Sequence, residues 1–335
     1  HETTQKIPDV DVLAVSPAME KFLERYILLY PNLQTRLHLL TTAVTSSGVL
    51  GFEYREGQTM TAAEAFDSRS GNCIGFANMM IALARKAGLQ AHYQEVFRRP
   101  QWISRANTVL LIKHVNVVVE SSRYTYVMDI SGINISPNAR RRIVMDDYAK
   151  ALYLNNLGAE ALLRNDLPTA YAYMEKAINT DPQMTDSWVN LGVVYGRNEQ
   201  LDSAELVLQR ALQIDSTQYA AMSNLYEVYL ERGNLEAAQN LHAKVEKYRQ
   251  ANPYYLMYLS EEALALEQFD DSIDLLKRAI RKRDDDHILY FALAKTQYLS
   301  GQRIAAENSL GRARELAPDN WLQHYSRPLD VLVAE

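Results

Sequence analysis

A repeat of 34 residues fills the second half of the 335-residue chain and constrains its fold more than any other sequence feature. Five units follow one another in constant register without an insertion, and they begin at Ala151, Thr185, Tyr219, Pro253 and His287. Leucine stands at the seventh position of every unit, and Ala, Ser or Val stands at the twentieth and twenty-seventh. A fixed period of this length predicts a stack of similar units, each of which buries its apolar face against its neighbours.

The spacing inside each unit predicts two paired helices, because its apolar residues recur at helical intervals. Gly158 and Gly192 fill the eighth position, where only a small side chain lets paired helices approach closely. These residues resemble the tetratricopeptide repeats, whose helix pairs form a superhelix. The resemblance implies an all-α superhelix of five 34-residue helix pairs over residues 151–318, with the segment 319–335 covering the exposed face of the last pair.

A superhelix of this family offers a concave groove lined by the first helix of each repeat, as the resemblance implies. Asn156, Asn190 and Asn224 share the sixth position of the first three repeats, so we expect their amides to stack as a ladder along one face. Such a ladder can hold a peptide backbone through its donors and acceptors; alternatively, asparagine merely suits a helix surface. We take these residues as partner-binding candidates and expect an extended or disordered protein as the partner.

The only cysteine of the chain, Cys73, stands at the predicted start of a buried helix in the first half. The preceding Ser70-Gly71-Asn72 offers a helix start, and apolar residues follow at helical spacing as far as Gly88, where a helix would stop. A helix N-terminus favours a thiolate and can hold a developing oxyanion. Cys73 is therefore a candidate nucleophile, and the alternative is that it acts as a small buried hydrophobe.

Two β-branched runs, Asn107–Glu120 and Tyr124–Ile130, predict a hairpin. With a two-residue loop at the serines between them, His114 lies directly opposite Asp129, with Cβ atoms about 5 Å apart. A carboxylate there can fix the imidazole tautomer and favour the imidazolium that a thiolate needs as its partner. A four-residue loop would instead put Asn116 opposite Asp129; we adopt the two-residue loop.

The order of a cysteine at a helix start, a histidine on a strand and an aspartate on the next strand resembles the transglutaminase-like branch of the papain-type thiol enzymes. Around the cysteine the match extends over Thr61–Phe66, over Gly71-Asn72-Cys73 and over Ala84–Ala91, where a helix end is followed by glycine, a small residue and a strand. The resemblance implies an α+β fold for the N-terminal domain.

The same resemblance gives Cys73, His114 and Asp129 the roles of nucleophile, general base and orienting residue. The sequence departs from the family pattern directly after the histidine, where Val115-Asn116 stands in place of a common aromatic residue. This departure bears on activity more than on fold.

We accordingly expect a papain/transglutaminase-like α+β domain followed by an all-α superhelix. The expected parts are an N-terminal arm (1–17), a transglutaminase-like domain (18–145), a connector (146–150), five repeats (151–318) and a C-terminal capping segment (319–335).

Charge argues against nucleic acid as a partner of the repeats. Residues 1–150 carry 17 basic and 14 acidic side chains, whereas residues 151–335 carry 18 basic and 27 acidic ones. An acidic superhelix repels phosphate and favours a basic or flexible polypeptide. The sequence has no His-x-x-x-His or paired-cysteine spacing and no glycine-rich phosphate loop, so we expect neither a metal nor a cofactor.

No apolar run approaches the 18 or so residues that a membrane span requires. The first residue is His1 rather than methionine, which either a removed signal peptide or lipid-anchored leader upstream of His1 or a cloning boundary would explain. We favour a periplasmic or membrane-anchored location over a cytoplasmic one.

These features lead to the hypothesis of a thiol enzyme that attacks an amide bond of a protein or peptide recruited by the repeats. If water resolves the acyl-enzyme, the protein is a peptidase or amidase; if an amine does, it is a transglutaminase. The small α+β core favours hydrolysis. The alternative is a catalytically silent domain carried by a repeat scaffold that binds a protein partner.

Overall fold

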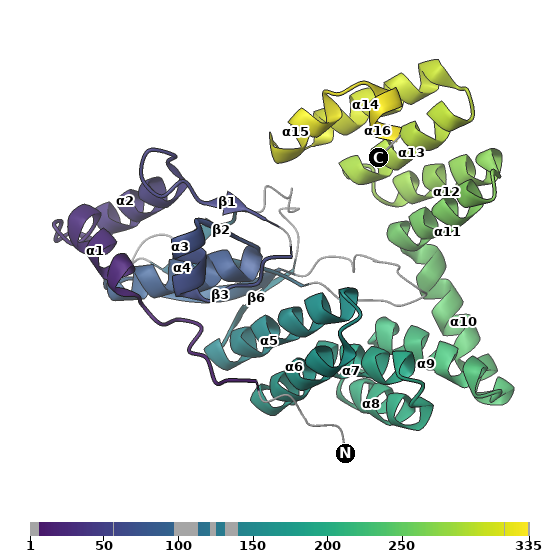
Figure 1. The fold of residues 1–335 in the computed structure, drawn as a ribbon, viewed down its shortest axis with the longest axis horizontal. Coiled ribbons are helices and arrows are strands. Elements are labelled where there is room, and N and C mark those ends of the chain that lie inside the picture. Colours follow the sequence, from purple (N-terminus) through teal and green to yellow (C-terminus); the bar gives the residue numbers. More distant parts are fainter. Residues whose placement is uncertain are drawn as a thin grey trace. The chain divides into compact units, whose positions relative to one another are not determined.

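The computed structural model describes residues 7–55, 57–96, 113–120, 125–130, 140–317 and 319–333. The chain forms two compact units, one ending at Ala221 and the other beginning at Met222. The boundary falls inside helix α9 (Tyr219–Glu231; Figure 1). The first helix pairs of the repeat region therefore belong to the same unit as the N-terminal domain.

Capping side chains start the first helices. Helices α1 (Pro17–Tyr26) and α2 (Leu33–Thr45) begin after a serine and an asparagine whose side chains accept backbone N–H bonds. Helix α3 (Ala62–Ser68) begins with a capping box, in which Thr61 and Glu64 each accept a bond from the other's backbone N–H.

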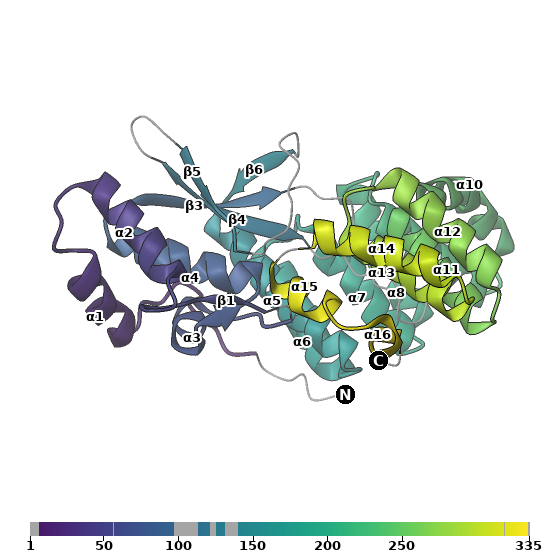
Figure 2. The ribbon, with the colours of Figure 1, turned by 90° about the horizontal axis from the view of Figure 1, so that it is seen from above.

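A layer of helices and a layer of sheet make up the N-terminal domain. The sheet has four antiparallel strands in the order β5-β4-β3-β6. Its strands are β3 (Gln90–Val96), β4 (His114–Glu120), β5 (Thr125–Met128) and β6 (Arg141–Val144). Helix α4 (Cys73–Lys86) packs along one face of this sheet (Figure 2). The short strands β1 (Glu53–Tyr54) and β2 (Ser70–Gly71) form a separate parallel pair.

The register of the β4–β5 hairpin differs from the one adopted above. Glu120 pairs with Thr125, and four residues, which lie outside the described part of the chain, join the two strands. The two-residue loop is therefore wrong, and the four-residue alternative holds. The two registers differ by two residues, which leaves every side chain on the same face of the sheet. An alternating apolar pattern cannot distinguish them.

The repeat region consists of paired antiparallel helices in the predicted phase. They are α5 (Asp146–Leu163) with α6 (Leu167–Thr180), α7 (Thr185–Arg197) with α8 (Leu201–Ile214), α9 with α10 (Leu235–Ala251), α11 (Pro253–Ala265) with α12 (Phe269–Lys282), and α13 (His287–Leu299) with α14 (Arg303–Leu316). Four of the five predicted unit starts are the first residues of helices. Helix α5 begins five residues earlier than its unit, inside the expected connector.

The C-terminal segment covers the last helix pair, as predicted. Helices α15 (Asp319–Tyr325) and α16 (Leu329–Val333) bury Tyr325, Leu329 and Leu332 in one apolar cluster with residues of α13 and α14. Within the described residues, no helix combines the length and the apolar character needed to cross a bilayer.

Close helix pairing depends on glycine in the second repeat. A Cβ atom at Gly192 would lie 2.6 Å from Cγ of Leu208, which projects from the partner helix α8. At Gly158 the nearest atom would be the flexible methyl end of Met174, at 2.7 Å. The small side chain predicted for the eighth position is thus confirmed, and Gly192 has the less yielding neighbour.

We expect Gly192→Ala to lower the free energy of unfolding by about 1–3 kcal/mol, because the added methyl group would overpack the α7–α8 contact. Gly196 lies in the same helix with open space around its Cβ position. Gly196→Ala is the matched control and should leave stability unchanged or raise it by up to about 1 kcal/mol. Urea denaturation of both variants measures the difference, and equal midpoints would contradict the packing argument.

Candidate active site

Cys73 is the first residue of helix α4 and is 8% exposed. The Asn72 side chain caps the helix by accepting a bond from the Gly75 backbone N–H at 3.0 Å, which confirms the predicted start. The Asn72 amide in turn donates to Oγ1 of Thr59 at 2.7 Å, so the cap itself is held in place. The thiol therefore stands at the positive end of a 14-residue helix.

His114 and Asp129 meet, although not as a directly opposed pair. His114 Nε2 lies 2.5 Å from Oδ2 of Asp129. The observed register extends to place Asn116, rather than His114, opposite Asp129. The two residues are diagonal neighbours on one face, a separation that side chains of this length can bridge. Because the register error was two residues, the predicted contact survives it.

His114 is almost fully buried, at 4% exposure. Burial lowers the pKa of its imidazole, but hydrogen bonds to the side chains of Asp129 and Cys73, together with their charges, raise the pKa to about 9. The raised pKa favours the protonated imidazole at neutral pH, with Nε2 bonded to the Asp129 carboxylate. The structure thus brings together the three side chains that the sequence singled out.

The asparagine side chains are placed differently from the expected ladder. The amide of Asn190 donates to Oδ1 of Asn155 at 3.0 Å, so its neighbour in the first repeat is Asn155 rather than Asn156. Asn190 is fully buried and Asn156 is half-buried. Asn224 is also buried but belongs to the second compact unit.

The sequence did not reveal a group of charged residues that meets at Lys113, the residue before His114. Lys113 Nζ lies 3.2 Å from Oε1 of Glu95 and 3.2 Å from Oδ2 of Asp186, and both carboxylates are buried. In the sequence, Glu95 and Lys113 are single charged residues inside two predicted strands, and Asp186 is a charged residue near a helix start. Such residues are ordinarily read as solvated.

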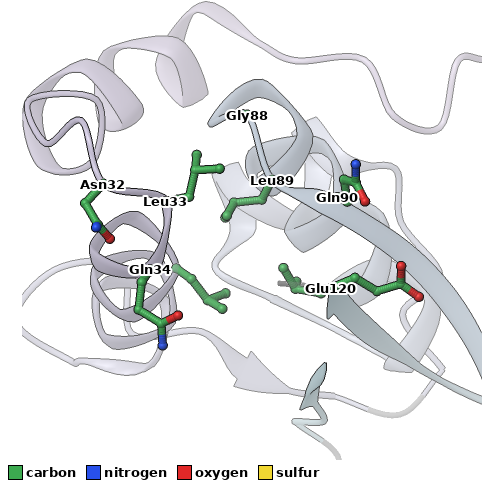
Figure 3. Close-up of a pocket in the computed structure, with 9 residues that line it drawn as sticks. Asn32, Leu33, Gln34, Gly88, Leu89, Gln90 and Glu120 are labelled. Atoms are coloured by element: carbon green, nitrogen blue, oxygen red, sulfur yellow. The ribbon is translucent and has the colours of Figure 1, made fainter. Parts of the chain in front are cut away.

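A pocket of about 670 Å³ lies at the other end of helix α4 from Cys73. Figure 3 shows Asn32 and Gln34 on one side of it, and Gln90 and Glu120 on the other. A helix of 14 residues is about 20 Å long, so this pocket is separate from the thiol.

The raised pKa of His114 predicts a pH-dependent stability. Its protonated form stabilises the fold fully below its ordinary pKa of 6.5, and this contribution is lost as the pH rises through about 9. We expect the loss to reach up to about 3 kcal/mol in the wild type and to be absent in His114→Gln. Unfolding free energies at pH 6 and above pH 9 test this. The exposed His38→Gln is the control, and an equal pH dependence in His114→Gln would contradict the assignment.

Both halves of the sequence are similar to known protein families. The sequence profile of the transglutaminase-like superfamily matches residues 37–128, and a tetratricopeptide repeat profile matches residues 197–260. The PEX5-related protein of Homo sapiens is 24% identical over 176 residues, which are 49% of this chain and 28% of that protein. The peroxisomal targeting signal receptor of Candida albicans is 26% identical over 215 residues, with 52% and 35% covered.

Solved structures of repeat proteins are also similar to the chain. YrrB, described as a TPR protein with an unusual peptide-binding site, has 16% identity and a TM-score of 0.29, covering 52% of this chain and 91% of that one. The chain spans about a third or less of the length of the two curated relatives. It carries a transglutaminase-like core domain followed by tetratricopeptide repeats, in the order that its sequence predicts.

Proposed function

We propose that this protein is a cysteine-dependent acyl-transfer enzyme that acts on an amide bond of a protein or peptide recruited by its repeats. The observation that carries the proposal is the buried His114 imidazole, which bonds to the Asp129 carboxylate and follows Lys113, whose carbonyl oxygen lies 4.0 Å from the Cys73 sulfur at a helix N-terminus. A thiol, a base and an orienting carboxylate in contact are the parts that nucleophilic catalysis requires.

The proposed reaction begins with the Cys73 thiolate paired to the His114 imidazolium. The sulfur attacks the amide carbonyl carbon, and backbone N–H groups at the start of α4 stabilise the resulting oxyanion. His114 then gives its proton to the departing amine as the C–N bond breaks, which leaves a thioester on Cys73. Asp129 holds the imidazole through Nε2 throughout, which leaves Nδ1 for the proposed proton transfer.

Water or an amine can resolve the thioester. With water, His114 takes a proton and the acid is released, so the enzyme is a peptidase or amidase. With a primary amine, a new amide forms, so the enzyme is a transglutaminase. We propose hydrolysis, because the α+β core of the N-terminal domain is small.

Recruitment is assigned to the repeats. One relative is named a peroxisomal targeting signal receptor. We propose that the repeats of this chain likewise hold an extended polypeptide, and of the asparagines considered, Asn156, Asn190 and Asn224, we assign the half-buried Asn156 to the contact. Of these three, Asn156 retains the most exposure.

The activated ester 4-nitrophenyl acetate tests the chemistry without knowledge of the natural substrate. We expect the wild type to release 4-nitrophenolate and to carry an acetyl group on Cys73, and Cys73→Ala to lose both. His114→Ala should slow acylation by about 10²–10⁴-fold, the usual contribution of a general acid–base group. The exposed His38→Ala is the matched control and should react at the wild-type rate.

Spectrophotometry and mass spectrometry of the intact protein provide the two readouts. Addition of a primary amine distinguishes the two resolutions, because amide formation in place of acetate would identify a transglutaminase. Equal rates for wild type and Cys73→Ala would overturn the enzyme and leave a repeat scaffold with a silent companion domain.

A further inference from the structure

Lys113 is the centre of an ionic cluster with two buried carboxylates, and this cluster touches the proposed active site. Its ammonium group lies 3.2 Å from a carboxylate oxygen of Glu95 and 3.2 Å from one of Asp186, and it donates to the Tyr148 hydroxyl at 2.9 Å. Arg142 Nε donates to the second oxygen of Glu95 at 2.7 Å. The two carboxylates and the two cations balance in charge.

The two carboxylates are shielded from water, whereas the Lys113 and Arg142 side chains are 24% and 48% exposed. Glu95 and Asp186 are 1% and 0% exposed, and the Tyr148 ring lies 5.5 Å from the Lys113 ammonium and 4.9 Å from the Arg142 guanidinium. Burial lowers the pKa of Lys113, but the charges of Asp186, Tyr148 and Glu95 raise it above the ordinary value. Lys113 is therefore charged, and moving it away from either carboxylate would leave a buried charge without its counterion.

Asp186 brings the repeats into this cluster. Glu95 lies on β3 and Arg142 on β6, whereas Asp186 stands in the first turn of α7, the first helix of the second repeat. All of these residues belong to the same compact unit. The second helix pair thus reaches the sheet at the residue that precedes the catalytic strand β4.

The backbone of Lys113 lies beside the thiol. Its carbonyl oxygen is 4.0 Å from the Cys73 sulfur, and the next residue is His114. Successive side chains of a strand point to opposite faces, so Lys113 anchors one face of the strand start and His114 bonds Asp129 on the other. A shift of the strand start would move the carbonyl and the imidazole together, relative to the sulfur.

We infer that Lys113 is a positioning residue, held by Asp186 of the second repeat, which fixes the start of β4 against the Cys73 sulfur. The repeats then complete the catalytic centre in addition to recruiting a substrate. This inference rests on the proposed function, because it concerns the same thiol. A buried ion pair contributes little net stability compared with apolar residues of similar volume, but it does fix distances and directions between its members.

The double variant Lys113→Met/Asp186→Leu, made in the full chain, tests the inference. It removes one positive and one negative charge, leaves Glu95 with Arg142, and fills the space with apolar side chains. The readout is the alkylation rate of Cys73 by iodoacetamide across a pH range, with thermal unfolding followed in parallel. We expect an unchanged unfolding temperature and an alkylation rate at neutral pH lower by about tenfold or more, with the pH profile displaced toward higher pH.

Two further variants complete the design. Asp186→Asn keeps the shape of the side chain and should also slow the alkylation of Cys73. It tests the inference if the double variant does not fold. Asp9→Asn removes an exposed ion pair with Lys150 on α5 and should react at the wild-type rate. A double variant that is as reactive as the wild type, with the same pH profile, overturns the inference alone. A wild-type thiol no more reactive than N-acetylcysteine overturns the proposed function and this inference with it.

Discussion

The packing of helix α4 against the sheet is the contact on which the rest of the N-terminal unit depends. All twelve residues from Cys73 to Ala84 are buried, and each fully buried large apolar side chain contributes about 1.5–3 kcal/mol. The one polar residue inside this stretch, Asn78, donates to the Met60 carbonyl and accepts from the Tyr93 hydroxyl, so burial leaves it bonded. A helix fixed so firmly sets the place of its first residue, and the sulfur therefore has a defined position relative to strand β4.

Much of this arrangement could be predicted because its signals are local or periodic. The helix start before Cys73, the capping box at Thr61 and the phase of the repeats each follow from residues close in sequence. The hairpin register could not be predicted, because a two-residue shift preserves the alternation of buried side chains. The meeting of His114 with Asp129 was nevertheless predictable, since it requires the same face and proximity rather than direct opposition.

The ionic cluster could not be predicted, because its members are charged residues whose partners lie in distant parts of the chain. Glu95 and Asp186 are 91 positions apart in the chain. The residues around each of them are such as also surround a solvent-exposed carboxylate. Only the folded chain shows that both face Lys113. Equal positions in successive repeats likewise do not determine side-chain contacts: Asn190 bonds to Asn155, one position before Asn156.

A single apolar core runs from the N-terminal helices into the first repeat and includes Leu152 and Leu154 of α5, Ala177 of α6 and Met184 before α7. The two halves of this unit are therefore not interchangeable building blocks. A gene fusion that joined foreign repeats to the N-terminal domain would have to reproduce both the apolar surface and the carboxylate at position 186. During synthesis on the ribosome, the N-terminal domain, which ends at residue 145, would have to wait for the chain to emerge as far as Met184, about 40 further residues, before its core could close.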